Sequence, residues 1–274
     1  MTKPPVTKTE STAGEVLLDI RDVTIRFGGV VALAEVDLQV RTGQIFGLIG
    51  PNGAGKTSCF NVITGVFRPT GGSVCFAGRS LAGLKPHRIT QLGLARTFQN
   101  IRLFPEMSAL ENVMVGADAH HRTGVAAAVL GLPVRRREER DGELLAHELL
   151  RFTGIGEAAD HAARSLSYGD QRRLEIARAL GTRPRLLLLD EPAAGMNPAE
   201  RQDLADLIRA IRERGVTVLL IEHDMGLVMT VSDRIAVLDF GRKIAEGLPS
   251  EVRESPTVVE AYLGRPDAGD DSAA

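Results

Sequence analysis

The chain has 274 residues, which is enough for one large domain or two small ones. With 43% hydrophobic and 25% charged residues it has the composition of a soluble globular protein, and its net charge of −2 argues against a nucleic-acid partner. No apolar run approaches the roughly 20 residues of a membrane-spanning helix, and the N-terminus has no apolar signal-peptide segment. Cys59 and Cys75 lack a metal-binding or redox spacing, so we expect two small buried residues in a reducing compartment. The protein is therefore expected to be cytoplasmic and to reach a membrane only through a partner.

The first predicted elements form an antiparallel pair. Residues 1–14 are polar, contain two adjacent prolines and are expected to be disordered. Val16–Phe27 alternates apolar and polar residues, which predicts a strand, and a glycine pair turns the chain into a partner strand over Val30–Val40. Phe27 stands at the strand end, where its ring is either an ordinary half-buried side chain or a platform for a nucleotide base. Position alone favours the first interpretation.

An octapeptide directly after a predicted buried strand, Ile45–Ile49, matches the phosphate-binding pattern G-x-x-x-x-G-K-[ST]. Its residues are Gly50, Pro51, Asn52, Gly53, Ala54, Gly55, Lys56 and Thr57. Glycines let backbone N–H groups surround a phosphate, and the helix predicted over Ser58–Val66 adds the positive end of its dipole. We expect Lys56 to contact the β- and γ-phosphates and Thr57 to hold Mg²⁺. A chance glycine-rich turn does not explain every fixed position together with these flanks.

A mostly helical segment is predicted between two parts of the core. Before it come a strand, a short helix and a second short strand, over Ser73–Phe76, Pro86–Leu92 and Leu94–Asn100. Ser108 and Glu111 have capping-box spacing, and apolar residues with helical spacing lead up to Phe152. The intervening charge run, 135–140, is interpreted as a solvated helix face that follows the apolar run 125–130.

Two further stretches carry groups suited to phosphate chemistry. Ser167 and Gly169 stand at the start of a predicted helix, which is a favourable place for an anion. Leu186–Leu189 reads as a strand buried on both faces, and Asp190 and Glu191 follow where ligands bind in α/β sheets. Asp190 is then suited to hold Mg²⁺ through water, and Glu191 to polarise an attacking water. A merely loop-capping acidic pair is hard to reconcile with a second phosphate motif in the chain.

The last third of the chain is predicted to contain further helices and strands of the core. Asn197 and Pro198 have the residue types of a helix start, and Val216–Ile221 predicts a third buried strand followed by His223. A lone histidine is more often structural, but this one ends a strand expected beside the Asp190 strand, where it could reach a terminal phosphate. A hairpin and a terminal helix are predicted over 235–245 and Glu251–Leu263.

The order of these motifs resembles that of the ATP-binding subunit of ABC transporters over about 16–264. In that comparison the segments correspond to Walker A (Gly50–Thr57), the Q-loop (Gln99), the signature (Leu166–Gln171), Walker B (Leu186–Glu191), the D-loop (Ala193–Asn197) and the switch histidine (His223). The resemblance implies an α/β fold, with a P-loop NTPase (RecA-like) core, an N-terminal antiparallel β subdomain and an inserted α-helical subdomain at 100–165. The ATPase domain would span 15–264, followed by a disordered tail at 265–274.

The resemblance also implies ATP and Mg²⁺ as cofactors and assigns residues to them. It assigns catalytic roles to Glu191, His223 and Gln99, and metal binding to Thr57, Gln99 and Asp190. ATP binding falls on the whole Walker A octapeptide, on Phe27 as the adenine-stacking aromatic, and on Ser167 and Gly169. The last two would contact the ATP of a second subunit in a head-to-tail dimer. Tyr168, Asp170 and Asn197 depart from the residues commonest in the family.

Within the family, the sequence is most similar to the larger type of branched-chain amino-acid importer ATPase. The supporting segments are Thr97–Phe104, Leu110–Gly116, Ala193–Pro198, Ile221–Met225 and Ala261–Gly264. Importers of urea or short amides and lipopolysaccharide exporters resemble it too, and a soluble ABC ATPase acting on DNA or the ribosome is a further alternative. Such a soluble protein usually has a coiled-coil insert or two ATPase units in one chain, and this sequence has neither feature.

A transport motor implies several partners. They are a second ATPase subunit (an identical copy or a paralogue), two multi-span membrane subunits and, indirectly, a periplasmic or extracellular binding protein, with the chain on the inner face of the membrane. The apolar residues after Gln99 are Ile101, Leu103, Phe104 and Met107. They either form a docking groove for a membrane subunit or pack the core of the helical insert.

Overall fold

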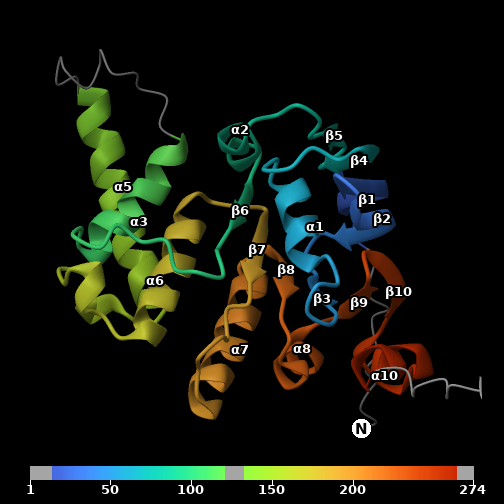
Figure 1. The fold of residues 1–274 in the computed structure, drawn as a ribbon. Helices are drawn as coiled ribbons and strands as arrows, with labels where there is room; N and C mark the ends of the chain where they lie inside the picture. Colours follow the sequence, from blue (N-terminus) through green and yellow to red (C-terminus); the bar gives the residue numbers. More distant parts are fainter. Residues whose placement is uncertain (1–13, 121–132, 264–274) are drawn as a thin grey trace, which may run out of the picture.

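The computed structural model describes residues 14–120 and 133–263 (Figure 1). The terminal segments predicted to be disordered lie outside the described residues apart from Gly14, as does the apolar run 125–130. In the described part of the chain, no helix is long and apolar enough to cross a membrane.

A six-stranded sheet forms the centre of the molecule, in the order β10-β9-β3-β8-β7-β6. The strands are β3 (Ile45–Ile49), β6 (Leu94–Arg96), β7 (Leu186–Asp190), β8 (Thr217–Ile221), β9 (Arg234–Asp239) and β10 (Arg242–Gly247). All neighbours are parallel except β9 and β10, which form the predicted hairpin. Every residue of β3, β7 and β8 is buried, which accounts for the continuous apolar runs in the sequence.

A second, antiparallel sheet has the order β2-β1-β4-β5. Its strands are β1 (Val16–Phe27), β2 (Val30–Arg41), β4 (Gly71–Phe76) and β5 (Arg79–Ser80), the last of which was not predicted. Helix α1 (Lys56–Ile63) lies between the two sheets, and its Phe60 joins Phe46 of β3 in the core that they share. The alternate β3 residues Ile45 and Ile49 face a second core under the helices of the opposite side.

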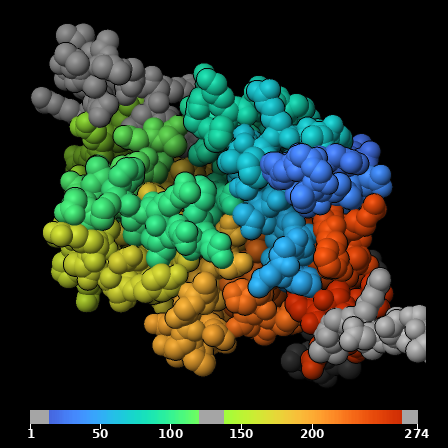
Figure 2. All heavy atoms as spheres, viewed as in Figure 1, coloured from blue at the N-terminus to red at the C-terminus, as the bar shows by residue number. Residues whose placement is uncertain are grey.

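The remaining helices form an insert and the far side of the core. The insert contains α3 (Ala109–Ala117), α5 (Pro133–Phe152) and the short helices η1 (Asp118–His120), η2 (Gly156–Ala158) and η3 (Ala163–Ser165). The core helices are α2 (Pro86–Gln91), α6 (Tyr168–Gly181), α7 (Pro198–Glu213), α8 (Met225–Val231), α9 (Pro249–Glu254) and α10 (Pro256–Leu263). In Figure 2 the insert, in green and yellow, forms a lobe on the left next to the orange core helices, while the blue antiparallel sheet lies on the right. Both predicted helix starts are present as capping boxes, Ser108 with Glu111 and Asn197 with Glu200.

Three local predictions were wrong. The terminal helix is two helices, because Pro256 has no N–H to donate and keeps Ser255 extended at φ −70° and ψ 117°. The strand expected over Leu94–Asn100 stops at Arg96. Thr97 still bonds to β7, through its N–H to the Leu188 carbonyl and through its hydroxyl to the Asp190 N–H, and Gln99 lies in a loop. Cys75 is only half-buried because it lies on the opposite face of β4 from the buried Val74 and Phe76, whereas Cys59 is buried in α1 as expected.

Candidate functional site

The Walker A loop connects β3 to α1 and has the backbone of a phosphate cradle. Gly53 and Gly55 adopt φ +81° and +101°, and a Cβ on Gly55 would lie 2.6 Å from the Ala32 carbonyl oxygen. Only glycine fits this position without displacing backbone. No acidic residue lies in the first turn of α1, so its N–H groups remain suited to an anion.

Lys56 is buried inside this loop. Its Nζ donates to the carbonyl oxygens of Gly50 at 2.7 Å and Pro51 at 3.0 Å. Desolvation lowers the pKa of the Lys56 ammonium, and the negative charges of Glu191 and Asp190 oppose that shift. The two carboxylates predicted from the end of β7 are therefore electrostatic neighbours of the loop lysine.

Parallel pairing brings the predicted polar residues to one edge of the sheet. β3, β8 and β7 are neighbours, so the segments after Ile49, Ile221 and Asp190 emerge side by side, as expected from the sequence. Asp190 is buried, and its Oδ2 accepts from Nη2 of Arg96 at 2.7 Å. Arg96 also donates to Asn61 of α1 at 2.8 Å, so it fixes the carboxylate against the phosphate-loop helix. The sequence interpretation missed Arg96, although a charged residue ending a buried strand was a usable signal.

Glu191 has a strained backbone and two polar neighbours. Its φ is +47°, which is unusual for a residue with a side chain. Its Oε2 accepts from Nε2 of Gln99 at 2.8 Å and lies 3.8 Å from Nδ1 of His223. The structure thus brings together the three side chains predicted to be catalytic, around one carboxylate oxygen.

Glu222 is a second polar residue that the sequence interpretation missed. It is fully buried, and its carboxylate accepts from the backbone N–H groups of Ala193 at 2.7 Å and His223 at 3.2 Å. Burial raises the pKa of the Glu222 carboxyl, and these hydrogen bonds oppose that shift. The side chain therefore ties the D-loop to the segment that carries His223. A glutamate directly after an apolar strand was its only signal in the sequence.

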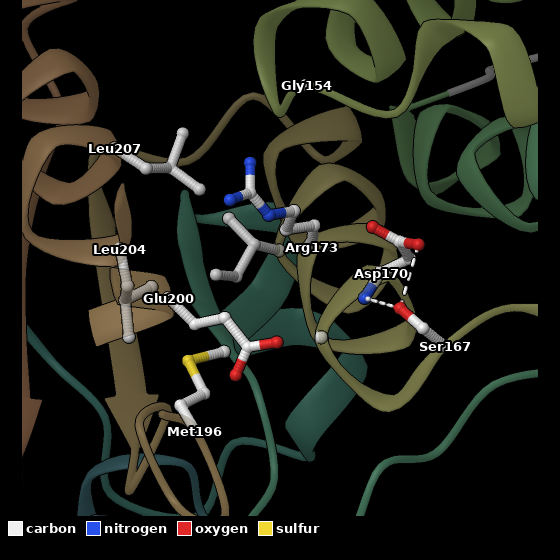
Figure 3. Close-up of a pocket in the computed structure, with 10 residues that line it drawn as sticks. Gly154, Ser167, Asp170, Arg173, Met196, Glu200, Leu204 and Leu207 are labelled. Atoms are coloured by element: carbon white, nitrogen blue, oxygen red, sulfur yellow. Dashed lines mark hydrogen bonds between the residues drawn. The ribbon is translucent and has the colours of Figure 1, made fainter. Parts of the chain in front are cut away.

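The signature residues lie on a separate surface, at the start of α6. Ser167 caps this helix: its Oγ accepts from the Asp170 N–H at 3.1 Å and donates to the Asp170 carboxylate at 2.8 Å. Ser167 and Gly169 line a cavity of about 260 Å³ between α6 and α7, shown in Figure 3 with Arg173 and Glu200 beside it. None of the described residues that line it belongs to the Walker A loop.

Phe27 and the apolar residues after Gln99 are partly exposed. The Phe27 side chain is 47% exposed and makes an edge-to-face contact with Phe67, with ring centroids 5.1 Å apart. Leu103 packs against the core, while Phe104 is 46% and Met107 38% exposed. Leu103 therefore packs in the core, as one of the two interpretations expects, while for the exposed Phe104 and Met107 the docking interpretation stays a prediction.

Comparison with known proteins identifies the family. The model of the ABC transporter family matches residues 33–194, more than half of the chain. This protein belongs to the ATP-binding cassette family of ABC transporters. A second model, described as branched-chain amino acid ATP-binding cassette transporter, matches residues 242–268 of this cassette. Cassettes of this family bind and hydrolyse ATP, so the chain is an ATP hydrolase.

Individual relatives agree with this assignment. The cassette is 49% identical over 249 residues to the high-affinity branched-chain amino acid transport ATP-binding protein BraF of Pseudomonas aeruginosa, covering 90% of this chain and 98% of the relative. A crystal structure of a nucleotide-free ATP-binding cassette from an ABC transporter has a TM-score of 0.80 at 31% identity, covering 91% of this chain and all of the other. A dimeric cassette in a post-hydrolysis state with ADP and phosphate has a TM-score of 0.72 at 26% identity, covering 85% and 99%. The predicted P-loop NTPase fold with its N-terminal antiparallel sheet is thereby confirmed.

Proposed function

We propose that this cassette is the ATP-hydrolysing subunit of an importer for branched-chain amino acids. The cargo is inferred from the similarity to BraF and from the C-terminal family match, because the cassette itself need not touch the cargo. The observation that carries the hydrolytic part is the convergence of Gln99 and His223 on Glu191 beside the Walker A loop. Uptake of urea or short amides and export of lipopolysaccharide are the alternatives that the experiment below distinguishes.

The residues around the Walker A loop fit Mg²⁺-ATP. The glycine conformations, the bare N-terminus of α1 and the buried Lys56 ammonium suit an anionic phosphate chain. Thr57, Asp190 and Gln99 offer the oxygen donors that Mg²⁺ takes beside phosphate oxygens. When bound, Mg²⁺-ATP supplies the phosphoryl group and a cation that neutralises its charge.

The chain's own groups would then act on water and on the γ-phosphate. Glu191 orients the attacking water and accepts its proton, and Gln99 holds the carboxylate in place through the 2.8 Å hydrogen bond. His223 stands within reach of the same carboxylate and would donate to the terminal phosphate. The strained φ of Glu191 fits a residue whose position serves chemistry rather than stability.

Assembly supplies the remaining contacts. Ser167 and Gly169 would contact the ATP of a second cassette, identical or paralogous, in a head-to-tail dimer, and the dimeric neighbour supports such an arrangement. Two multi-span membrane subunits would hold the dimer on the inner face of the membrane, with an external binding protein acting through them. The exposed side chains of Phe104 and Met107 are the proposed contact with a membrane subunit.

Cells that lack this chain should lose uptake of labelled leucine, isoleucine and valine, and expression of the wild-type cassette should restore it. Phe104→Asp should abolish both restoration and co-purification with the membrane subunits, because a charge at a half-exposed apolar contact must be desolvated in the complex. The isolated variant should keep its ATPase activity.

Leu248→Asp is the matched control for this experiment. Leu248 is 50% exposed at the N-cap of α9, where aspartate is a favoured residue, so uptake should be unchanged. Restored uptake of urea instead of branched-chain amino acids would contradict the cargo. Normal co-purification of Phe104→Asp would move the docking surface elsewhere.

Phe27→Ala should weaken ATP binding by about 1–3 kcal/mol, roughly 5- to 150-fold in Kd, because the ring is proposed to stack on adenine. Phe27→Tyr should bind as the wild type does, since it keeps the aromatic face. A titration with fluorescent ATP measures all three proteins. Equal affinities for Phe27→Ala and the wild type would make Phe27 a structural residue that only packs on Phe67.

A further inference from the structure

Arg172 is a fully buried arginine on the second turn of α6. Its Nη1 donates to the Phe98 carbonyl at 2.6 Å and to Oε2 of Glu175 at 3.1 Å. Its Nη2 donates to the Gln99 carbonyl at 2.6 Å and to the hydroxyl oxygen of Tyr168 at 3.0 Å. One guanidinium therefore connects the signature helix to the loop that carries Gln99.

Glu175 completes the same connection from the next turn of α6. Its Oε1 accepts from the backbone N–H groups of Phe98 and Arg102, both at 3.3 Å. Both backbone polar groups of Phe98 are thus bound to the Arg172–Glu175 pair. The loop between β6 and the insert is fixed to α6 at both ends of the segment 98–102, and Gln99 lies inside that segment.

Tyr168 extends the network to the D-loop. It stands where the family most often has glycine, and its hydroxyl is held by Arg172. A Cβ built on Gly195 would lie 3.4 Å from the Tyr168 ring, so the ring packs directly against the loop after β7. The departure at this signature position therefore has a structural consequence: it links α6 to a segment four residues after Glu191.

Stability alone does not account for this arrangement. Arg172 and Glu175 are 0% and 1% exposed, and removing two charges from water costs several kcal/mol, so an apolar pair of similar volume is often as stable. The pair instead holds the Gln99 loop in place, because its hydrogen bonds are made to the backbone of that loop.

We propose that Arg172 is a positioning residue for ATP hydrolysis. Together with Glu175 and Tyr168, it locks the Gln99 loop and the D-loop to the start of α6. A movement of Ser167 and Gly169 toward the ATP of a second cassette then moves Gln99 relative to Glu191. This inference rests on the proposed function.

Arg172→Met tests the proposal in the assembled transporter, by ATP turnover at several ATP concentrations. We expect kcat to fall about 10- to 100-fold, the loss typical of a misplaced catalytic group, while KM for ATP stays within about threefold of the wild-type value. Arg209→Met is the matched control. Arg209 also forms an i,i+3 pair with an acid, Asp206, but on the exposed face of α7, and its kcat should be unchanged.

Hydrogen exchange separates positioning from a general loss of structure. In Arg172→Met the Phe98 and Arg102 amides should exchange faster, while those of the buried strand β8 keep their protection. Tyr168→Phe removes one hydrogen bond at constant shape and should lower kcat about 2- to 12-fold. If Arg172→Met does not fold, this second variant decides the matter.

Wild-type kcat in Tyr168→Phe, or in a folded Arg172→Met whose loop amides exchange faster, would overturn the proposal. If Arg172→Met loses both kcat and the protection of the amides throughout β8, Arg172 is a stability residue and the proposal is overturned as well. An assembled wild-type transporter that does not hydrolyse ATP would instead contradict the proposed function, so the two failures are distinguishable.

Discussion

Glu191→Gln should lower ATP turnover by about 10²- to 10⁴-fold, the range typical for loss of a general base. The amide keeps an oxygen that can accept from Gln99 and has nearly the same shape, so the Walker A loop should bind ATP as before. Because closure of two cassettes on ATP no longer leads to hydrolysis, the variant should accumulate as a dimer. An ATPase assay and size-exclusion chromatography with ATP measure the two effects.

The matched control for this experiment is Glu254→Gln, the same substitution on the exposed side of α9. It should leave both turnover and elution volume unchanged. Undiminished turnover in Glu191→Gln would remove Glu191 from the mechanism. Reduced turnover with equally reduced ATP affinity would assign it to nucleotide binding.

Much of the fold could be predicted because local signals and packing agree. The Leu186–Leu189 run has to be a strand buried on both faces, and the capping boxes at Ser108 and Asn197 mark helix starts through hydrogen bonds between near neighbours. The pairing of β7 with β8 was expected, and in the structure it places His223 3.8 Å from Glu191.

The misses have physical causes too. Pro256 divides the terminal helix, although the apolar spacing of the segment continues through it. Arg172 lies in a run of charged residues, a pattern that predicts a solvated surface residue. In the structure it is buried, because it donates to carbonyl oxygens of a loop some 70 positions earlier in the sequence. Hydrophobic periodicity cannot reveal such a residue, since its burial depends on partners distant in sequence.

Substitution of Lys56 should have a similarly large effect, in this case on ATP binding. Lys56→Met should abolish detectable ATP binding, and with it hydrolysis, because it removes the one ammonium that lies inside the Walker A loop while keeping much of the apolar stem. A titration with fluorescent ATP measures the loss, with Lys243→Met as control: that lysine pairs with Glu246 on β10 and should be dispensable for binding.

The stability of the nucleotide-free Lys56→Met variant provides an independent check on this role. Burial lowers the pKa of Lys56 in the folded state below its value in the unfolded state. At every pH below the folded-state pKa, the charged ammonium therefore destabilises the folded state. This destabilisation decreases as the pH rises from the folded-state pKa to the unfolded-state pKa, where it is lost. Near neutral pH the substitution therefore removes a cost, while it also leaves the Gly50 and Pro51 carbonyls without their donor. Because these effects oppose each other, we expect the thermal midpoint to change little while binding is lost. A large fall in the midpoint that accounts for the lost binding would show that Lys56 holds the loop together and is not primarily a phosphate ligand.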